Sequence, residues 1–384
     1  MKGTFPLEKI KAIETPFYFY DTELLRHTLD IVKNEADKYG CRVHYAVKAN
    51  SNAKILKIIA SYGFGADCVS GNEVKAAIEA GFPASGIVFA GVGKNDKEIN
   101  LALDYGIFCF NAESIPELEV INELAAAKHK TANIAIRVNP NVDAHTHRHI
   151  TTGLNENKFG FYWNDALNVI NTFQKFANLN LIGVHFHIGS QITDFSSFQN
   201  LCVRINELQD IFDKENIQIK HINIGGGLGV NYEHPNHFPI PDFETYFRLF
   251  HKNLRLREGQ ELHAEPGRSI IAQCASLVTT VVYVKTGAQK KFAIVDAGMT
   301  DLIRPALYDA YHRIENITSD EVEDVYDVVG PICESSDVFQ KDVVMNGTKR
   351  GDLLVLRTAG AYGEAMASQY NLRDLPKSYL SEGL

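Results

Sequence analysis

The segment VHYAVKANSNAKILKIIASYGFGADCVS (43–70) contains two short apolar runs of β type with a segment of helical period between them. The runs are VHYAVKA (43–49) and GADCVS (65–70), and Ile55 and Ile59 fall on one face of the intervening helix. A glycine follows this helical segment, as is usual for the residue that closes a helix. The segment therefore predicts a strand, a helix and a second strand parallel to the first.

The same alternation continues to about residue 265. Six further strand-like runs are separated by amphipathic segments: GIVFAG (86–91), GIFCFN (106–111), NIAIRVN (133–139), LIGVHFHI (181–188), KHINIG (220–225) and ELHAE (261–265). Eight strands joined by helices are the number that closes a β/α barrel, so we predict an α/β fold with an eight-stranded, TIM-like barrel. The alternative is an open doubly wound sheet, but it usually has a phosphate-binding turn after its first strand, where this chain has KANSN.

The sequence changes character after residue 268. Val-rich runs such as ASLVTTVVYVK and DLLVLRTAG predict a second, mostly β domain. The early run TPFYFYD is also strand-like, and we expect it to pair with that domain. The predicted domains are a barrel over 25–268 and a β-rich domain made of 1–24 and 269–384.

Composition limits the classes of partner. A net charge of −9 and a pI near 5.9 argue against nucleic acid or an anionic membrane. The N-terminus has no apolar signal-peptide run and no stretch is long enough to span a membrane. Six cysteines without a CxxC pair predict no disulfide framework and no metal site, which fits reduced thiols in a cytoplasm. Five are expected in the core; Cys333 is a candidate functional residue.

The active site of a β/α barrel lies at the carboxyl ends of its strands, whatever the reaction. Reading these ends collects the candidates Lys48, Asp67, Ser70, Arg137, His187, Ser190, Gly225–Gly229, Glu265 and Arg268.

Lys48 has small or apolar neighbours, which favour an imine-forming lysine with a lowered pKa. The other interpretation is a lysine paired with a carboxylate. The run Gly225-Gly226-Gly227-Leu228-Gly229 lets backbone N–H groups approach an anion, at a position where barrels commonly bind phosphate. A lysine and a phosphate cradle leave two classes of enzyme: a sugar-phosphate aldolase and a pyridoxal-phosphate enzyme.

Glu265 favours the second class. A carboxylate facing the pyridine nitrogen keeps the cofactor ring protonated and electron-withdrawing, as a decarboxylation requires. Without a cofactor, Glu265 would be a salt-bridge partner for Arg268. His187 could stack on the ring; His185 is on the same face of the strand, so one of the two could serve only for packing.

Together these residues resemble the ornithine-decarboxylase-like group of pyridoxal-phosphate enzymes, and within it the diaminopimelate decarboxylases. The resemblance extends from TPFYFYD to GAYGEAMASQYN. It implies a Schiff base on Lys48, His187 on the ring face and Glu265 on the pyridine nitrogen. It further implies that the phosphate and the rest of the cofactor contact Asp67, Ser190, Gly225, Gly226, Gly227 and Tyr362.

Other segments of the resemblance concern the substrate, meso-2,6-diaminopimelate, which would be converted to L-lysine and carbon dioxide. NPNVDAHTHRHITTG with NKFG, DLIRPALYDAYH and GPICESSD are similar to segments of that family. They imply that the far end of the substrate is held by Arg268, Arg304, Tyr308, Tyr362 and Glu334. They also imply that Cys333 donates a proton, and that Cys333 and Glu334 enter the site of the other subunit in a homodimer.

Two alternatives remain open at this point. One is a decarboxylase of another two-headed amino acid, such as carboxynorspermidine. The other is a non-catalytic relative, which should lack Lys48, Cys333 or the residues for the far end of the substrate, all of which are present here. The chain also departs from the family pattern: Thr300 stands where Asn is usual, and LRDLPKSYL (372–380) replaces S-R-P-R-P.

Overall fold

The computed structural model describes residues 5–142 and 158–384, which form two compact units. The barrel unit consists of Leu29–Gly229 and Asp242–Gly267. The β-rich unit consists of Met1–Thr28, Val230–Pro241 and Arg268–Leu384. The segment 230–241, which the sequence analysis placed in the barrel, thus groups with the β-rich unit.

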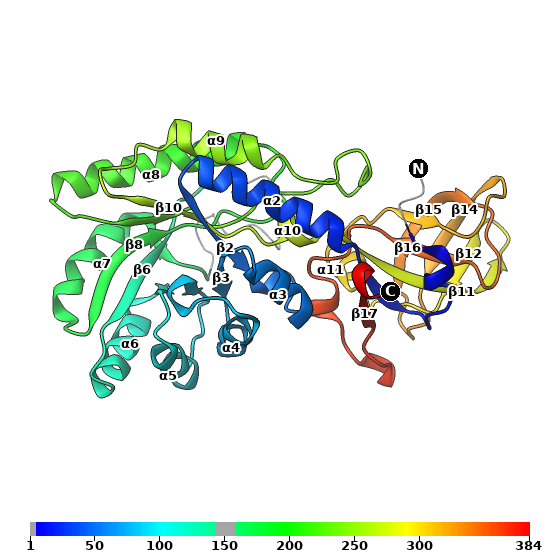
Figure 1. Cartoon of the computed structure of the whole chain (residues 1–384), viewed down its shortest axis with the longest axis horizontal. Helices are drawn as coiled ribbons and strands as arrows, with labels where there is room; N and C mark the ends of the chain where they lie inside the picture. The colour runs from blue at the N-terminus through cyan, green and yellow to red at the C-terminus, as the bar shows by residue number, and fades with distance from the viewer. Residues whose placement is uncertain (1–4, 143–157) are drawn as a thin grey trace. The chain divides into compact units, whose positions relative to one another are not determined.

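The barrel predicted from the sequence is confirmed (Figure 1). All eight predicted runs form parallel strands: β2 (Cys41–Ala46), β3 (Gly65–Cys68), β4 (Ile87–Phe89), β5 (Cys109–Ala112), β6 (Ala132–Asn139), β8 (Leu179–His185), β9 (His221–Asn223) and β10 (Glu261–Ala264). They are ordered β5-β4-β3-β2-β10-β9-β8-β6, and pairing of β5 with β6 closes the ring. A short strand, β7 (Phe161–Tyr162), adds to the edge of β6.

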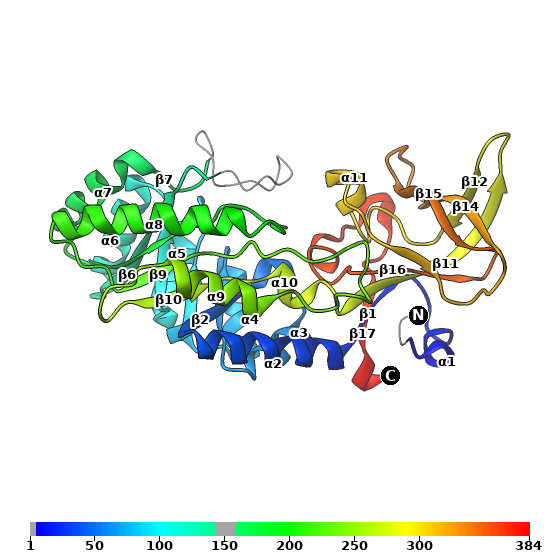
Figure 2. The same ribbon diagram turned by 90° about the horizontal axis from the view of Figure 1, so that it is seen from above.

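Helices follow the strands. Consecutive helices pack side by side from α3 to α6, and so do α8 and α9, as Figure 2 shows for the last pair. They are α3 (Ala53–Ala60), α4 (Gly71–Ala80), α5 (Asp96–Tyr105), α6 (Ile115–Ala127), α7 (Ala166–Thr172), α8 (Ser196–Lys214) and α9 (Phe243–Asn253), after α2 (Thr22–Lys38). Local sequence fixes their ends: Asn95 and Glu98 form a capping box at the start of α5, and Gly106 closes it in the left-handed conformation. In the part of the chain that is described, no helix is long and apolar enough to cross a membrane.

Polar residues occupy one face of the neighbouring strands β9 and β10. Glu261 is paired with His221, and His263 with Asn223, in the parallel register. Residues two apart on a strand share a face, so Glu261, His263 and Glu265 line up in one column. Asn111 of β5 donates to Glu265, and because β5 and β10 are not neighbours in the ring, this column faces the barrel interior.

The second unit is a mostly β structure. Its strands are β1 (Phe17–Tyr20), β11 (Ala275–Thr286), β12 (Lys291–Val295), β13 (Ile314–Asn316), β14 (Glu323–Val329), β15 (Val338–Asn346), β16 (Leu353–Leu356) and β17 (Lys377–Leu380), with the short helices α1 (Leu7–Ile10), α10 (Arg268–Ile271) and α11 (Arg304–Tyr308). As predicted, the early strand β1 joins this unit, antiparallel to β11 and parallel to β17. Buried Phe17, Val278 and Val355 form part of its core. The segment LRDLPKSYL (372–380), which departs from the family pattern, contains β17, and this strand lies at an edge because it pairs with β1 alone among the described strands.

Candidate active site

Lys48 lies in a short 3-10 turn, η1 (Val47–Ala49), immediately after the first barrel strand. Its flanking residues Val47 and Ala49 are fully buried. The Lys48 ammonium pairs with Oδ2 of Asp67 at 2.9 Å, so the carboxylate pairing considered as the other interpretation is present. The lysine side chain keeps 36% of its surface exposed, whereas that of Asp67 is fully buried. Lys48 therefore opens onto the carboxyl end of the barrel while its partner lies inside.

Glu265 is a buried carboxylate held by three donors. Its Oε2 lies 2.9 Å from His185 Nε2, and its Oε1 accepts from Asn223 at 2.6 Å and from Asn111 at 3.3 Å. Burial alone raises the pKa of Glu265, but the charge and hydrogen bond of His185 outweigh it and hold the pKa below its ordinary value. Glu265 is therefore an anion inside the barrel, and His185 orients it rather than serving only for packing.

The pKa of Asp67 moves in the opposite direction. Burial raises it to about 6, with the nearby charge of Glu265 acting in the same direction and Lys48 against it. Oδ1 of Asp67 is fully covered and has no hydrogen-bond partner among the described residues. Such an atom normally finds a donor when a buried site is filled.

The glycine run after β9 makes a close approach of backbone to backbone. A Cβ at Gly225 would lie 2.2 Å from the Phe186 carbonyl oxygen, and one at Gly226 would lie 2.3 Å from that of Glu265. Gly226 N–H also donates to Nδ1 of His187 at 3.3 Å. Removal from water, with the charges of Lys48 and Arg137, lowers the pKa of His187 well below its usual value. His187 is thus a neutral ring anchored on the glycine run.

These residues fit pyridoxal phosphate. The cofactor needs an amine, an anion for its ring nitrogen and backbone donors for its phosphate. Lys48, the anionic Glu265 and the glycine run supply one each, and the orphaned Oδ1 of Asp67 can accept a further donor. An aldolase would use the lysine and the phosphate cradle but has no need of a buried anion such as Glu265.

The β-rich unit contains a cluster of two buried arginines. Arg268 donates to the Tyr232 hydroxyl at 2.6 Å and lies 4.8 Å from the ring centre of Tyr362. Arg304 lies 4.9 Å from the ring centre of Tyr232, and its Nη1 is 2.8 Å from Nε2 of His312. Burial lowers the pKa of the Arg304 guanidinium, and Arg268 lowers it further.

A buried cation without a carboxylate partner is a site for an anionic ligand. Within the described chain Arg304 forms no ion pair; its partners are an aromatic ring and a histidine. The His312 Nδ1–H donates to the Arg357 carbonyl at 2.9 Å, which leaves Nε2 to accept from Arg304. Burial lowers the pKa of His312 to about 3, so this acceptor persists at every physiological pH. His312 therefore fixes the direction of Arg304.

Cys333 and Glu334 lie on an exposed turn of the β-rich unit. The Cys333 N–H donates to Oδ1 of Asn371 at 3.0 Å, and the Tyr370 hydroxyl donates to Glu334 Oε1 at 2.6 Å. Cys333 is exposed, whereas Cys41, Cys68, Cys109, Cys202 and Cys274 are buried, as predicted.

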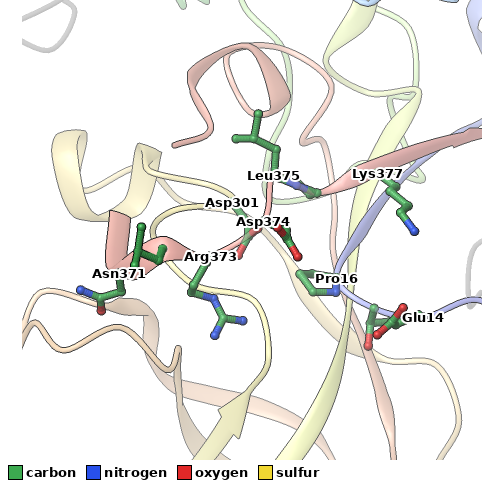
Figure 3. A pocket seen from close by; sticks show the side chains of 11 residues that line it. Glu14, Pro16, Asp301, Asn371, Arg373, Asp374, Leu375 and Lys377 are labelled. Carbon is green, nitrogen blue, oxygen red and sulfur yellow. The ribbon is translucent and has the colours of Figure 1, made fainter. Parts of the chain in front are cut away.

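The divergent C-terminal segment lines a cavity of about 490 Å³ (Figure 3). Residues 371–377 form most of its wall, opposite Glu14–Pro16 and Asp301. Arg373 donates to the backbone oxygen of Asp296 at 2.6 Å, which anchors the segment. None of the residues predicted to bind cofactor or substrate lines this cavity, so it is distinct from the candidate site.

The remaining candidates predicted from the sequence differ in where they lie and in what they contact. Ser70 caps α4 by accepting from Glu73, which is a structural role. Arg137 pairs with Glu113 at 3.2 Å inside the barrel. Ser190 lies in the turn after β8, as a phosphate contact requires, and Tyr308 ends α11. Most of the predicted insert NPNVDAHTHRHITTG falls on 143–157 and lies outside the described residues.

Sequence reasoning missed the polar residues that orient the candidates, namely Asn111, Asn223, Tyr232 and His312. Asn223 has the same strand parity as the glycine run, so its inward direction could have been inferred. Asn111 could not, because its contact with Glu265 crosses the barrel.

Comparisons with known proteins agree with this geometry. Residues 24–272 match the family described as pyridoxal-dependent decarboxylase, pyridoxal binding domain. The chain is 61% identical to a diaminopimelate decarboxylase of Bacteroides thetaiotaomicron over the full length of both, and 43% identical to that of Neisseria meningitidis serogroup B over 97% of this chain and 89% of the relative. The crystal structure of diaminopimelate decarboxylase from Helicobacter pylori with L-lysine superposes with a TM-score of 0.92 at 39% identity, covering 97% of this chain and 93% of that one.

Proposed function

The chain belongs to the pyridoxal-dependent decarboxylases, and within them to the diaminopimelate decarboxylases, and we propose that it converts meso-2,6-diaminopimelate to L-lysine and carbon dioxide. The observation that carries this proposal is Glu265, a buried anion held by His185, Asn223 and Asn111. A relative with this name at 61% identity and a homologous structure with L-lysine bound support the choice of reaction.

We assign the cofactor chemistry to the barrel unit. Pyridoxal phosphate, when bound, withdraws the electron pair of the broken carbon–carbon bond. Lys48 would hold the cofactor and then be displaced from it by the amino group of the substrate. Glu265 would keep a proton on the ring nitrogen, and the neutral His187 would lie on the ring face. Asp67 would receive a donor on its orphaned oxygen, and the N–H groups of Gly225–Gly227 would bind the phosphate.

We assign recognition of the far end of the substrate to the β-rich unit. Diaminopimelate carries an amino-acid group at each end, so the end that is not cleaved presents both a carboxylate and an ammonium. Arg268 and Arg304 can bind the carboxylate through planar, bidentate hydrogen bonds. We assign Tyr308 and Tyr362 to the same end of the substrate. Tyr362 is held at a φ of 57°, in the left-handed region that a non-glycine residue rarely adopts, which fits a residue with a functional task.

We further propose that Glu334 binds the far ammonium and that Cys333 reprotonates the α-carbon, both acting in the other subunit of a homodimer. Their exposure on one turn supports a role at an interface. The unpaired thiols support a reducing compartment, the cytoplasm. Mixing inactive Lys48→Ala and Glu334→Ala subunits should restore part of the activity, and mixtures that stay inactive would exclude shared sites.

The proposed activity is tested by carbon dioxide release from meso-diaminopimelate, L-lysine, L-ornithine and carboxynorspermidine. Release from meso-diaminopimelate alone is expected, because the other substrates leave the arginine cluster without its carboxylate or misplace it. Borohydride treatment of the loaded enzyme should fix the cofactor on Lys48, as mapped by peptide mass. Cofactor fixed elsewhere would refute the role of Lys48, and preferred turnover of carboxynorspermidine would refute the substrate.

A further inference from the structure

Three histidines form a hydrogen-bonded chain near the amino ends of the barrel strands. The chain begins at the Gly86 carbonyl, which lies 2.9 Å from His44 Nδ1. His44 Nε2 lies 2.9 Å from His263 Nδ1, and His263 Nε2 lies 3.0 Å from His221 Nδ1. The proposed reaction uses none of these residues, since its groups lie at the carboxyl ends of the same strands.

The carbonyl fixes the tautomers along this chain. A carbonyl only accepts, so His44 carries its proton on Nδ1 and accepts at Nε2. His263 must then donate from Nδ1, and its lone pair is on Nε2. The result is a histidine whose Nδ1–H is held by a second residue, as in metal-ligating histidines, and whose Nε2 lone pair accepts from His221 Nδ1–H until an ion takes the place of that proton.

A carboxylate completes the set. Oε2 of Glu261 lies 3.6 Å from His221 Nδ1 and 3.8 Å from His263 Nε2. This oxygen is fully covered, yet it accepts no hydrogen bond from any described residue. Its nearest charge is Arg42, whose Nε lies 3.2 Å away on an exposed side chain.

The separations suit an ion. His221 Nδ1, His263 Nε2 and Glu261 Oε2 are 3.0, 3.6 and 3.8 Å apart in pairs. A point between them lies about 2 Å from all three atoms, which is the usual length of a Zn–N or Zn–O bond. We propose that His221, His263 and Glu261 bind a zinc ion, with water as the fourth ligand. Two imidazoles and one carboxylate with an open position are a ligand set that zinc takes in proteins.

Two features of the surroundings make loading feasible. Glu261 and His221 keep 44% and 18% of their side chains exposed, so an ion can enter from solvent. On binding, the proton on Nδ1 of His221 moves to Nε2, and Arg42 turns away from Glu261; an exposed ion pair of this kind contributes little. Arg42 and Lys220 are the nearby cations that oppose the ion, and both must stay in solvent.

The ion would join β9 to β10, since Glu261 and His221 are cross-strand partners. These two strands lead into the glycine run and Glu265 at their other ends. The site was not expected from the sequence because His221 lies 40 residues before Glu261, and the pair Glu261 and His263 alone is not a recognised ligand motif. It also uses no cysteine.

The test is zinc binding to the cofactor-loaded enzyme after removal of metals with a chelator. Calorimetric titration should show one zinc per chain. Glu261→Gln should weaken this binding by at least roughly tenfold and His221→Ala by roughly a hundredfold or more. Both side chains are partly exposed, so the variants should fold, which thermal unfolding checks. Glu79→Gln, which removes an exposed carboxylate of α4 in the same unit, should bind zinc as the wild type does.

The position of the ion is tested by anomalous diffraction from zinc-soaked crystals of the wild type. A peak between His221, His263 and Glu261 is expected, and it should be lost in His221→Ala. Zinc bound only at Cys333 or at the cofactor, equal affinity in all four proteins, or no stoichiometric binding would each overturn the proposal.

Discussion

Replacing Asp67 with Asn should stabilise the cofactor-free enzyme at neutral pH. Asp67 is fully buried, one of its oxygens pairs with Lys48, and the other has no partner among the described residues. Burial and the charge of Glu265 raise its pKa from 3.8 to about 6. The folded protein therefore holds a proton on Asp67, between about pH 4 and 6, that the unfolded chain has lost.

The sign of the pH dependence follows from this difference. The free energy of unfolding falls as the pH rises from about 4 to 6, because the folded state binds the proton on Asp67 more tightly than the unfolded state does. A shift of about two pKa units corresponds to roughly 3 kcal/mol above pH 6, of which about 1.4 kcal/mol develops between pH 5 and pH 8. Asn has the same shape and no charge, so it removes this dependence. Lys48 loses its partner, but it is partly exposed and stays solvated.

The assay is urea unfolding of the cofactor-free wild type and Asp67→Asn at pH 5, 6, 7 and 8. The difference in free energy of unfolding should grow with pH in favour of Asp67→Asn, while Asp37→Asn, an exposed carboxylate on α2, should show no such growth. Cofactor affinity should fall in Asp67→Asn by about tenfold or more, since a buried ligand-facing charge is lost. A variant less stable than the wild type at pH 8, or a difference that does not change with pH, would refute this account of Asp67.

Three further predictions concern the candidate site. Glu265→Gln should lower turnover at least a hundredfold while it costs only about 1 kcal/mol of stability, because the amide can still accept from both asparagines; carbon dioxide release and thermal unfolding measure the two, and near-normal turnover would contradict the role of Glu265. Gly226→Ala should destabilise by about 1–3 kcal/mol and weaken cofactor binding, since its Cβ would lie 2.3 Å from a backbone oxygen; unchanged cofactor affinity in a titration would exclude the glycine run as the phosphate site. His312→Leu should raise KM for diaminopimelate about tenfold with little change in kcat, because Arg304 loses its fixed direction; a change in kcat alone would contradict this positioning role.

The fold could be predicted because each barrel strand has a recognisable pattern in its own short stretch of sequence. An apolar run of β type appears at all eight positions, several of them followed by a helical period and a closing glycine, and each run became a strand. The assignment of β1 to the β-rich unit also held, since TPFYFYD precedes the first βα repeat. The segment Val230–Pro241 was missed because it has no periodicity of its own, and its grouping with the β-rich unit rests on tertiary contacts.

Sequence patterns pointed to the reactive groups of the candidate site, which stay predictions, but not to the residues that support these groups in the structure. Lys48, Glu265 and the glycine run follow strands and have residue types that point to a chemistry. Asn111 supports Glu265 from a strand on the other side of the ring, and only barrel closure brings the two together. Tyr232 lies 36 residues before Arg268 in a segment without a motif.

The polar column on β10 shows why these supporting residues matter. His263 and Glu265 are buried in the barrel interior, where apolar residues would stabilise the fold better, since a buried charge or imidazole is costly unless it is paired. Glu261 begins the column and keeps 44% of its side chain exposed. Glu265 is paired by three donors, which agrees with a functional anion. His263 is hydrogen-bonded on one nitrogen to His44 and on the other to His221. Glu261 Oε2 lies 3.2 Å from Arg42 Nε but accepts no hydrogen bond among the described residues. A column that departs from the pattern of an ordinary core at both ends indicates two tasks, the proposed cofactor chemistry at the carboxyl end and the proposed zinc ion at the amino end.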